Sequence, residues 1–244
     1  MTDPTALAER LAEVQERIAQ SAVRSGRSAD ELTLIVITKF HPVELVRDLI
    51  DLGVRDFGEN RHQEARQKAA ELAADPTTPD DLRWHFVGQL QTKKARQVRE
   101  YASVIHSVDR PELADALGRR TSDRGSVEDD TRTDVFLQID LDERSSADPS
   151  RGGVAPADLA ALTERIVASE SLRLLGPMAV APLGMEPIRA FMRLRELAEQ
   201  IRAVSPSSRF ISAGMSGDFE TAIEVGATHL RVGTAITGSR PALP

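Results

Sequence analysis

The chain has 244 residues, of which 41% are hydrophobic and 28% charged, a composition typical of a globular protein with one large domain or two small ones. Its net charge of −7 disfavours a nucleic-acid or membrane-surface protein, because such proteins need a basic face to meet phosphate. The absence of cysteine excludes disulfides, thiolate nucleophiles and cysteine-ligated metals. Since the sequence also lacks an apolar signal-peptide core and a membrane-spanning stretch, we expect a cytoplasmic protein that binds a small molecule.

Predicted strands and helices alternate along the chain. An amphipathic helix over about 4–24 comes first, and the segment 32–38, rich in β-branched residues, then predicts a strand that leads into a helix over 43–53. The same strand–helix unit recurs. Further strands are expected at 54–60, 83–88, 103–109, 133–141, 172–180, 209–215 and 228–236, and further helices at 61–72, 92–101 and 217–225 and from Pro111, Pro156 and Pro187.

Eight nearly continuous apolar strands that alternate with helices indicate a single (β/α)8 TIM barrel rather than an open sheet. We expect one domain over 1–244, with 1–30 as an N-terminal helical extension and without a C-terminal β domain. The polar loop 121–133 joins a helix to a strand and is expected to be flexible surface. The loop 142–154 follows a strand, so it borders the reaction face and is a candidate lid.

A lysine, Lys39, ends the first predicted strand in the segment LTLIVITKF. In barrels of this kind the C-terminal ends of the strands line the reaction face, so Lys39 is expected there. Apolar walls disfavour a charged ammonium and favour a nucleophilic amine, which forms a Schiff base with an aldehyde. The alternative is that Lys39 extends to solvent, as a lysine at a strand end commonly does.

Two glycine-containing turns follow the last two predicted strands. In barrels the loops at these two places commonly bind phosphate through backbone amides. Each turn alone is a weak motif, but two adjacent turns opposite a nucleophilic amine indicate a site for an aldehyde cofactor that carries a phosphate. The residues expected to form it with Lys39 are Ser212, Gly214, Met215, Ser216, Arg231, Gly233 and Thr234.

Several segments together resemble those of the pyridoxal phosphate homeostasis proteins, the single-domain relatives of the alanine racemase barrel. They are TKF, FGENRHQEA, WHFVGQLQTKK, HSVDR, GPMAVAP and SAGMSGDFETAIEVGATHLRVGTAITG, and they extend over nearly the whole chain. The resemblance implies a barrel that holds pyridoxal 5′-phosphate (PLP) as an internal aldimine on Lys39, without established catalytic turnover. The family's usual pattern differs at Lys93, Arg151 and Ala213, and an arginine at 151 puts in doubt a second nucleophilic lysine in the loop after the fifth strand.

The resemblance also implies a role for each matching site residue. Ser216, Gly233 and Thr234 would take the phosphate, Asn60 would lie near the phenolic edge of the ring, and Arg231 would face the pyridine nitrogen. A permanently charged guanidinium disfavours a proton on that nitrogen and so weakens the ring as an electron sink. The expected function is therefore PLP homeostasis, in which the protein binds PLP reversibly and releases it by transimination to an incoming amine.

Two alternatives stay open. A racemase-like PLP enzyme would need a second base, yet the one tyrosine, Tyr101, falls on the helix after the third strand, away from the expected site. A Schiff-base aldolase without cofactor would use Lys39 alone. The binding protein, the racemase and the aldolase differ in colour, in amino-acid turnover and in trapping by borohydride.

The remaining features carry weaker expectations. The five histidines show no metal-ligand spacing, so no metal is expected, and His85 beside Trp84 fits a packed core histidine better than a proton shuttle. Lys93 and Lys94 belong to a basic helix face that is most simply solvated charge. We expect a monomer that makes transient contact with PLP-requiring apoenzymes and binds neither nucleic acid nor membrane.

Overall fold

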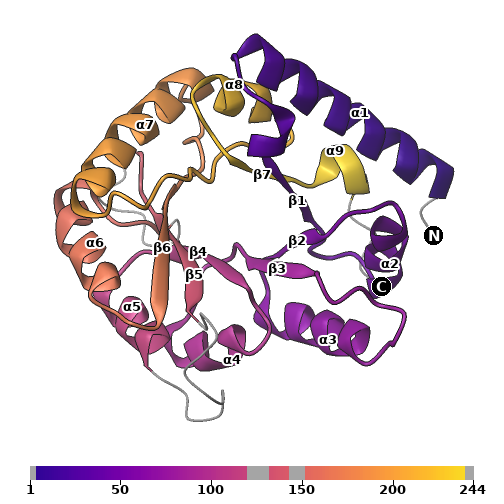
Figure 1. Cartoon of the computed structure of the whole chain (residues 1–244), viewed down its shortest axis with the longest axis horizontal. Coiled ribbons are helices and arrows are strands. Elements are labelled where there is room, and N and C mark those ends of the chain that lie inside the picture. The colour runs from indigo at the N-terminus through magenta and orange to yellow at the C-terminus, as the bar shows by residue number, and fades with distance from the viewer. Residues whose placement is uncertain (1–3, 120–131, 143–151, 240–244) are drawn as a thin grey trace.

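The computed structural model of the protein describes residues 4–119, 132–142 and 152–239. Its strands form one curled parallel sheet, and helices cover the outside of that sheet (Figure 1). The strands are β1 (Thr33–Ile37), β2 (Asp56–Glu59), β3 (Arg83–Phe86), β4 (Val104–Val108), β5 (Thr133–Gln138), β6 (Leu172–Met178) and β7 (His229–Val232). The helices are α1 (Pro4–Arg24), α2 (Val43–Asp51), α3 (His62–Ala73), α4 (Ala95–Arg99), α5 (Pro111–Gly118), α6 (Leu159–Val167), α7 (Pro187–Val204), α8 (Phe219–Glu224) and α9 (Thr234–Thr237), with short 3-10 turns at Ala29–Glu31, Thr92–Lys94 and Pro156–Asp158.

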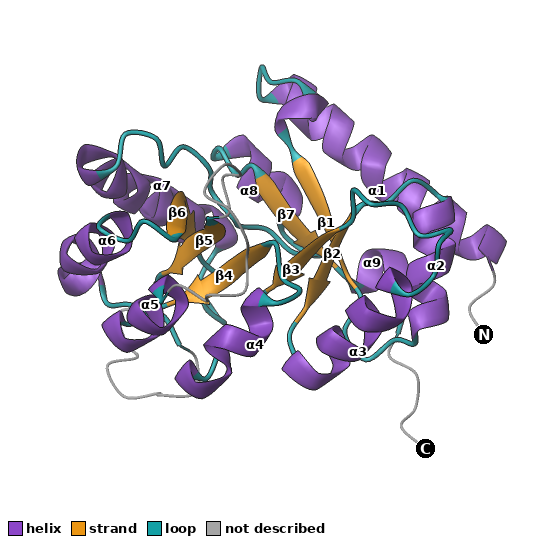
Figure 2. Ribbon diagram, turned by 60° about the horizontal axis from the view of Figure 1, so that its bottom comes forward, coloured by secondary structure: helices purple, strands orange, loops and turns teal. Residues whose placement is uncertain are grey.

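The sheet has the order β6-β5-β4-β3-β2-β1-β7, with neighbouring strands parallel. This arrangement confirms the predicted class, an α/β fold with a parallel sheet inside a layer of helices (Figure 2). The strands have buried apolar side chains on both faces, as expected when helices cover one face and the interior of the curled sheet fills the other. Because all strands run the same way, their C-terminal ends gather on one rim.

The expected seventh strand, 209–215, is not a strand. Instead Ser212 makes isolated parallel bridges to Met178 of β6 and to His229 of β7, so this segment joins the two edges of the sheet at single points. The extended stretch ends at Gly214, whose φ of 92° turns the chain. A Cβ atom there would lie 2.9 Å from atoms of Ala222 and Phe219, so the turn packs directly on α8. The segment 209–215 therefore lies between β6 and β7, as predicted, but it does not form a regular strand.

The first helix, α1, is part of the helical layer. Its buried side chains Leu7, Leu11, Val14 and Ile18 recur every three or four residues and form one apolar stripe. The helix lies against α8 and α9 (Figure 1). Burial of one such side chain contributes about 1.5–3 kcal/mol, so α1 stabilises the part of the sheet that carries the last turn.

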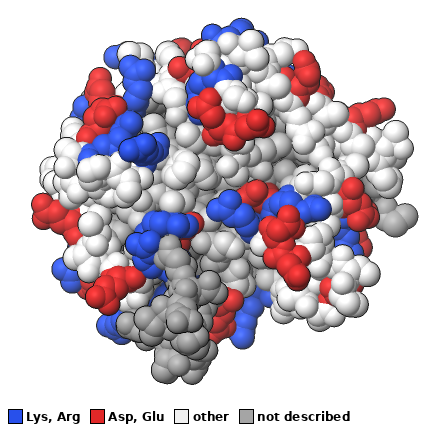
Figure 3. All heavy atoms as spheres, viewed as in Figure 1, with Lys and Arg blue, Asp and Glu red and all other residues white. Residues whose placement is uncertain are grey.

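Two expectations concern loops whose central parts lie outside the described residues. They are the flexible loop 121–133, of which 132–133 are described, and the candidate lid 142–154, of which 142 and 152–154 are described. Arg151 falls outside as well. In the part of the chain that the structure does cover, no helix has both the length and the apolar character needed to cross a membrane. Figure 3 shows basic and acidic side chains interspersed around the face in view.

Candidate functional site

Lys39 lies in a turn two residues after β1 and is half-buried. The turn is fixed from several sides, because the Thr38 amide donates to the Gly58 carbonyl at 3.0 Å and the His41 amide donates to the Thr38 carbonyl at 3.1 Å. Phe40 has a φ of 68°, a conformation uncommon for a bulky side chain. The sequence thus continues past the strand into a strained turn that presents Lys39 at the C-terminal rim.

A buried ionic network supports this turn from α3. The Lys68 ammonium donates to the Thr38 carbonyl at 3.0 Å and to the carboxylates of Glu59 at 2.7 Å and Glu64 at 2.8 Å. Glu64 also accepts the Phe40 amide at 2.6 Å, so the strained residue is bonded to the same group. All three ammonium hydrogens have an acceptor, which fits a charged lysine that holds structure rather than a nucleophile.

The sequence analysis missed Lys68 and the role of its partners. A lysine four residues after Glu64 on a helix predicts an exposed i,i+4 pair, whereas the Lys68 side chain is 6% exposed and that of Glu59 1%. Burial raises the pKa of the Glu59 carboxyl, and the Lys68 ammonium opposes that shift. The Thr38 hydroxyl donates to the same carboxylate at 2.7 Å, so the network reaches the residue next to Lys39.

Asn60 follows β2 on the same rim. Its side-chain oxygen is buried and has no hydrogen-bond partner within the described residues. The backbone around it is tightly packed, since a Cβ atom at Gly88 would lie 2.1 Å from the Asn60 carbonyl oxygen. A buried acceptor without a donor costs about 1–3 kcal/mol, and a ligand hydroxyl would remove that cost.

The last two turns form a cluster of donors around Ser216. The backbone amides of Gly233 and Ala235 and the Thr234 hydroxyl all point to the Ser216 hydroxyl oxygen, each at 3.3 Å. Three donors that converge on one oxygen at long distance match the charge distribution of an anion better than that of a hydroxyl. Of these residues, sequence reasoning missed Ala235, whose contribution is a backbone amide.

This donor cluster adjoins the strand that carries Lys39. A Cβ atom at Gly233 would lie 3.3 Å from the Ile37 side chain, so the turn after β7 packs on the end of β1. The register of β1 with β7, in which Val36 lies beside Val232, puts both turns on one rim. The structure therefore places the turn that carries Lys39 and the donor cluster on the same rim.

Three further predicted site residues have distinct positions. Met215 is 39% exposed and its amide donates to the Asp218 carboxylate at 2.6 Å, while the Gly214 carbonyl accepts the Arg231 amide at 2.9 Å. Ser212 is fully buried inside the curled sheet. Gly214 thus shapes the turn, and Met215 lies at its exposed edge.

Arg231 lies in β7 and is 5% exposed. Its guanidinium donates through one terminal nitrogen to the Ser212 hydroxyl at 2.5 Å and through the other to the Ala179 carbonyl at 2.8 Å. Burial lowers the pKa of Arg231 to about 10, with an opposing effect of the Asp218 carboxylate, so the guanidinium is charged at neutral pH. Both of these acceptors are uncharged.

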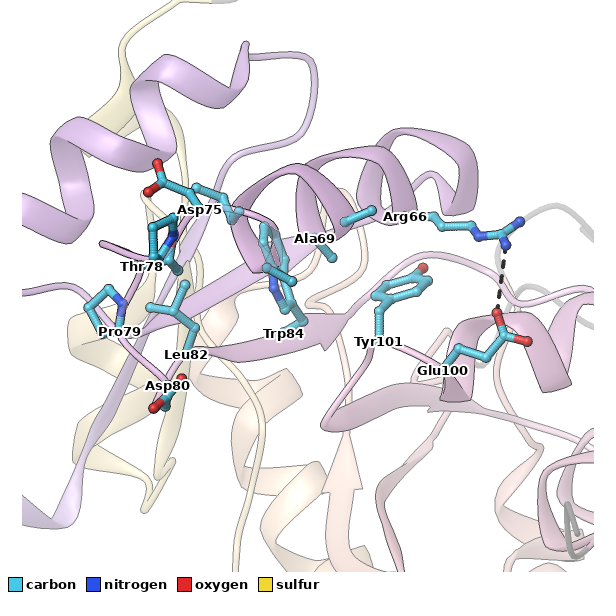
Figure 4. Close-up of a pocket in the computed structure, with 14 residues that line it drawn as sticks. Arg66, Ala69, Asp75, Thr78, Pro79, Asp80, Leu82, Trp84, Glu100 and Tyr101 are labelled. Atoms are coloured by element: carbon cyan, nitrogen blue, oxygen red, sulfur yellow. Dashed lines mark ion pairs between the residues drawn. The ribbon is translucent and has the colours of Figure 1, made fainter. Parts of the chain in front are cut away.

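Tyr101 lies elsewhere, as the sequence analysis expected. Its ring stacks on that of His62 and lines a pocket of about 560 Å³ over β3, between α3 and the end of α4, together with Trp84 and Leu82 (Figure 4). Arg66 and Glu100 form an ion pair of 3.8 Å at this pocket (Figure 4). None of the predicted site residues lines it. Over the described ranges, no group of three metal-ligating side chains is found.

Comparison with known proteins supports the resemblance. The family model of the alanine racemase N-terminal domain matches residues 5–241. The pyridoxal phosphate homeostasis protein of Corynebacterium glutamicum is 40% identical over 231 residues, which cover 93% of this chain and 99% of that protein, and the one from Escherichia coli is 35% identical over 96% and 97% of the two chains.

Solved structures give the same result. PipY of Synechococcus elongatus, solved with PLP bound, has a TM-score of 0.73 and 33% identity over 95% of this chain and 100% of its own. Alanine racemase from Corynebacterium glutamicum, at 15% identity, has a TM-score of 0.69 over 99% of this chain and 64% of its own, so it shares the fold. The chain therefore belongs to the alanine racemase N-terminal domain family and, within it, to the pyridoxal phosphate homeostasis proteins.

Proposed function

We propose that this protein binds pyridoxal 5′-phosphate in the service of PLP homeostasis, with Lys39 as the residue that holds it. When bound, the cofactor supplies an aldehyde that condenses with a primary amine and releases water, and a second amine reverses the attachment by exchange. The support comes from the PLP-bound PipY relative and from the curated relatives that carry this function in their names. The observation that carries the proposal is the donor cluster on the same rim as Lys39.

The residues around Lys39 have complementary roles in this proposal. Ser216, Gly233 and Thr234, joined by the Ala235 amide, hold the phosphate, because the donors of Gly233, Thr234 and Ala235 already converge on the Ser216 hydroxyl oxygen. The unmatched Asn60 oxygen accepts the phenolic hydroxyl of the ring. Lys68 keeps the Lys39 turn in its strained conformation through Thr38 and Glu64.

Arg231 favours binding over catalysis. It faces the pyridine nitrogen and, since it is charged at neutral pH, it disfavours a proton on that nitrogen. Without that proton the ring is a weak electron sink, which slows the reactions of a bound amino acid. Tyr101 is engaged with His62 and offers no second base at this rim. We therefore infer a binding protein without strong turnover, for which an exchanging amine is the natural release step.

We extend the proposal to the closure of the sheet and to the location and oligomeric state of the protein. The bridges through Ser212 support a (β/α)8 barrel that closes through 209–215. We also propose that the protein is a cytoplasmic monomer that contacts PLP-requiring apoenzymes only transiently. Its acidic net charge of −7 fits a small-molecule ligand.

The test is the visible absorbance of the purified protein after addition of PLP and removal of the excess. Wild type is expected to retain a band that hydroxylamine bleaches, and Lys39→Ala to lack that band although it folds as wild type does. A colourless wild type would contradict the proposal. Conversion of an L-amino acid to its D form that depends on Lys39 would contradict the absence of turnover and favour the racemase alternative.

A further inference from the structure

A chain of hydrogen bonds crosses the interior of the curled sheet and ends at Arg231. From Asp56 in β2, the Oδ1 atom lies 2.7 Å from Nε2 of His85 in β3, and Nδ1 of His85 lies 2.9 Å from Nε2 of His106 in β4. Nδ1 of His106 lies 2.9 Å from the Ser212 hydroxyl, which accepts from Arg231 at 2.5 Å. Both histidines, Ser212 and Arg231 are buried, whereas the Asp56 side chain is 19% exposed.

The chemistry of the two ends fixes the direction of every bond. The Asp56 carboxylate only accepts, so His85 carries its proton on Nε2 and, as a neutral ring, accepts at Nδ1. His106 then donates from Nε2 to His85 and accepts the Ser212 hydroxyl proton at Nδ1, while the Ser212 oxygen accepts from Arg231, which only donates. Two neutral histidines of the same tautomer satisfy the whole chain, and the reverse order would require a protonated, donating carboxyl group at Asp56.

The protein environment keeps both histidines neutral. Burial lowers the pKa of His85, and burial together with the neighbouring His85 and Arg231 lowers the pKa of His106 far below its usual value. His106 is further enclosed by aromatic rings, since it stacks on Phe136 at 4.6 Å between ring centroids. At the outer end, the Arg83 guanidinium lies 3.7 Å from the Asp56 carboxylate. This enclosure favours neutral forms of His85 and His106 whose hydrogen bonds all run in one direction.

We propose that His85 and His106 are positioning residues for Arg231, and through it for the pyridine nitrogen of the cofactor. The inference rests on the proposed function, in which Arg231 faces that nitrogen. If His106 lost its acceptor at Nδ1, the Ser212 proton would have no fixed direction and could turn toward the guanidinium, which would push Arg231 away from its present pose. The Asp56 carboxylate, at the N-terminal end of β2 and three hydrogen bonds away from Ser212, sets the direction of the hydrogen bonds that prevents this.

The first test measures the tautomers of the two histidines in the cofactor-free protein. Nitrogen-15 NMR of the imidazole rings is expected to show His85 and His106 as neutral Nε2–H tautomers in wild type at neutral pH. Asp56→Asn retains an acceptor oxygen and should preserve both signals, whereas Asp56→Ala should alter them. Nδ1–H tautomers or charged rings in wild type would overturn the inference, whether or not PLP binds.

The second test uses the PLP-loaded protein. His106→Leu is expected to shift the visible band and to release PLP to an added amine about tenfold faster than wild type, since a broken buried hydrogen bond weakens the pose of Arg231. His229→Leu is the matched control. His229 is buried in the same core, but its ring is hydrogen-bonded to the Thr228 hydroxyl at 2.9 Å and not to a member of the hydrogen-bond chain. The variant should keep the wild-type band and release rate.

A serine variant covers the case in which His106→Leu does not fold. Ser212→Ala removes the link at the arginine and should reproduce the shifted band. If wild type binds PLP and both His106→Leu and Ser212→Ala keep its band and release rate, the inference is wrong and the proposed function stands. If wild type binds no PLP, the proposed function fails, and the NMR measurement alone decides the order of the chain.

Discussion

Lys68 and Arg231 are both buried cations beneath the same rim, and their surroundings differ in kind. Lys68 lies between the carboxylates of Glu59 and Glu64, so its charge is neutralised within the protein. Arg231 is bonded to a hydroxyl and a carbonyl, and the chain behind that hydroxyl continues through neutral histidines. A neutralised cation holds structure, whereas a cation with uncharged acceptors keeps positive potential for a ligand. The comparison favours a structural role for Lys68 at the Lys39 turn and is consistent with the role toward the cofactor that is proposed for Arg231.

Replacement of Lys68 is expected to have the largest effect on stability. Lys68→Met leaves the Glu59 carboxylate buried without its cation, which should lower the free energy of unfolding in urea by about 3–5 kcal/mol. The double variant Lys68→Met, Glu59→Gln removes the stranded charge and should recover part of that loss. A loss below about 1 kcal/mol in the single variant would show that Lys68 does not hold the turn.

Replacement of Arg231 should separate binding from stability. Arg231→Met leaves only the Ser212 hydroxyl and the Ala179 carbonyl without their donor, so the free energy of unfolding should fall by about 1–3 kcal/mol, less than for Lys68→Met. The visible band of bound PLP should shift at the same time. Equal destabilisation by the two substitutions, measured side by side in urea, would remove the distinction between the cations.

The buried histidines predict a dependence of stability on pH. Burial lowers the pKa of His229 from 6.5 to about 3, so the folded protein binds fewer protons than the unfolded chain between these values. Stability is therefore present above pH 6.5 and is lost as the pH falls toward 3, by at most about 1.4 kcal/mol per pH unit for this one residue. His229→Gln should reduce the slope between pH 7 and pH 5 in urea unfolding experiments. An unchanged slope would contradict the burial of a neutral His229.

The rim was predictable from the sequence because parallel strands place their C-terminal ends together. That rule predicts Lys39, Asn60 and the turns around Gly214 and Gly233 on one edge. Their roles toward the cofactor stay predictions. The prediction of a regular strand at 209–215 was wrong, because an apolar pattern does not show that Gly214 turns the chain so early.

The interior contacts could not be predicted in the same way. Lys68 has the spacing of an exposed helical lysine, and its burial depends on how α3 lies against the turn after β1. The His85 side chain was expected in the core and lies there, but its alignment with His106 and Ser212 depends on the register of three separate segments, which are β3, β4 and 209–215. Such alignments follow from packing in three dimensions, which no single segment encodes.

Covalent attachment of PLP to Lys39 is the central claim, and borohydride reduction tests it directly. The PLP-loaded protein is reduced, digested and mapped by mass spectrometry, with Lys39→Arg as the control that keeps a positive charge but cannot form the link. The account predicts one phosphopyridoxyl group per chain, on the peptide that contains Lys39, and none in the variant. A label on another lysine, or no label on a protein that binds PLP tightly, would contradict it.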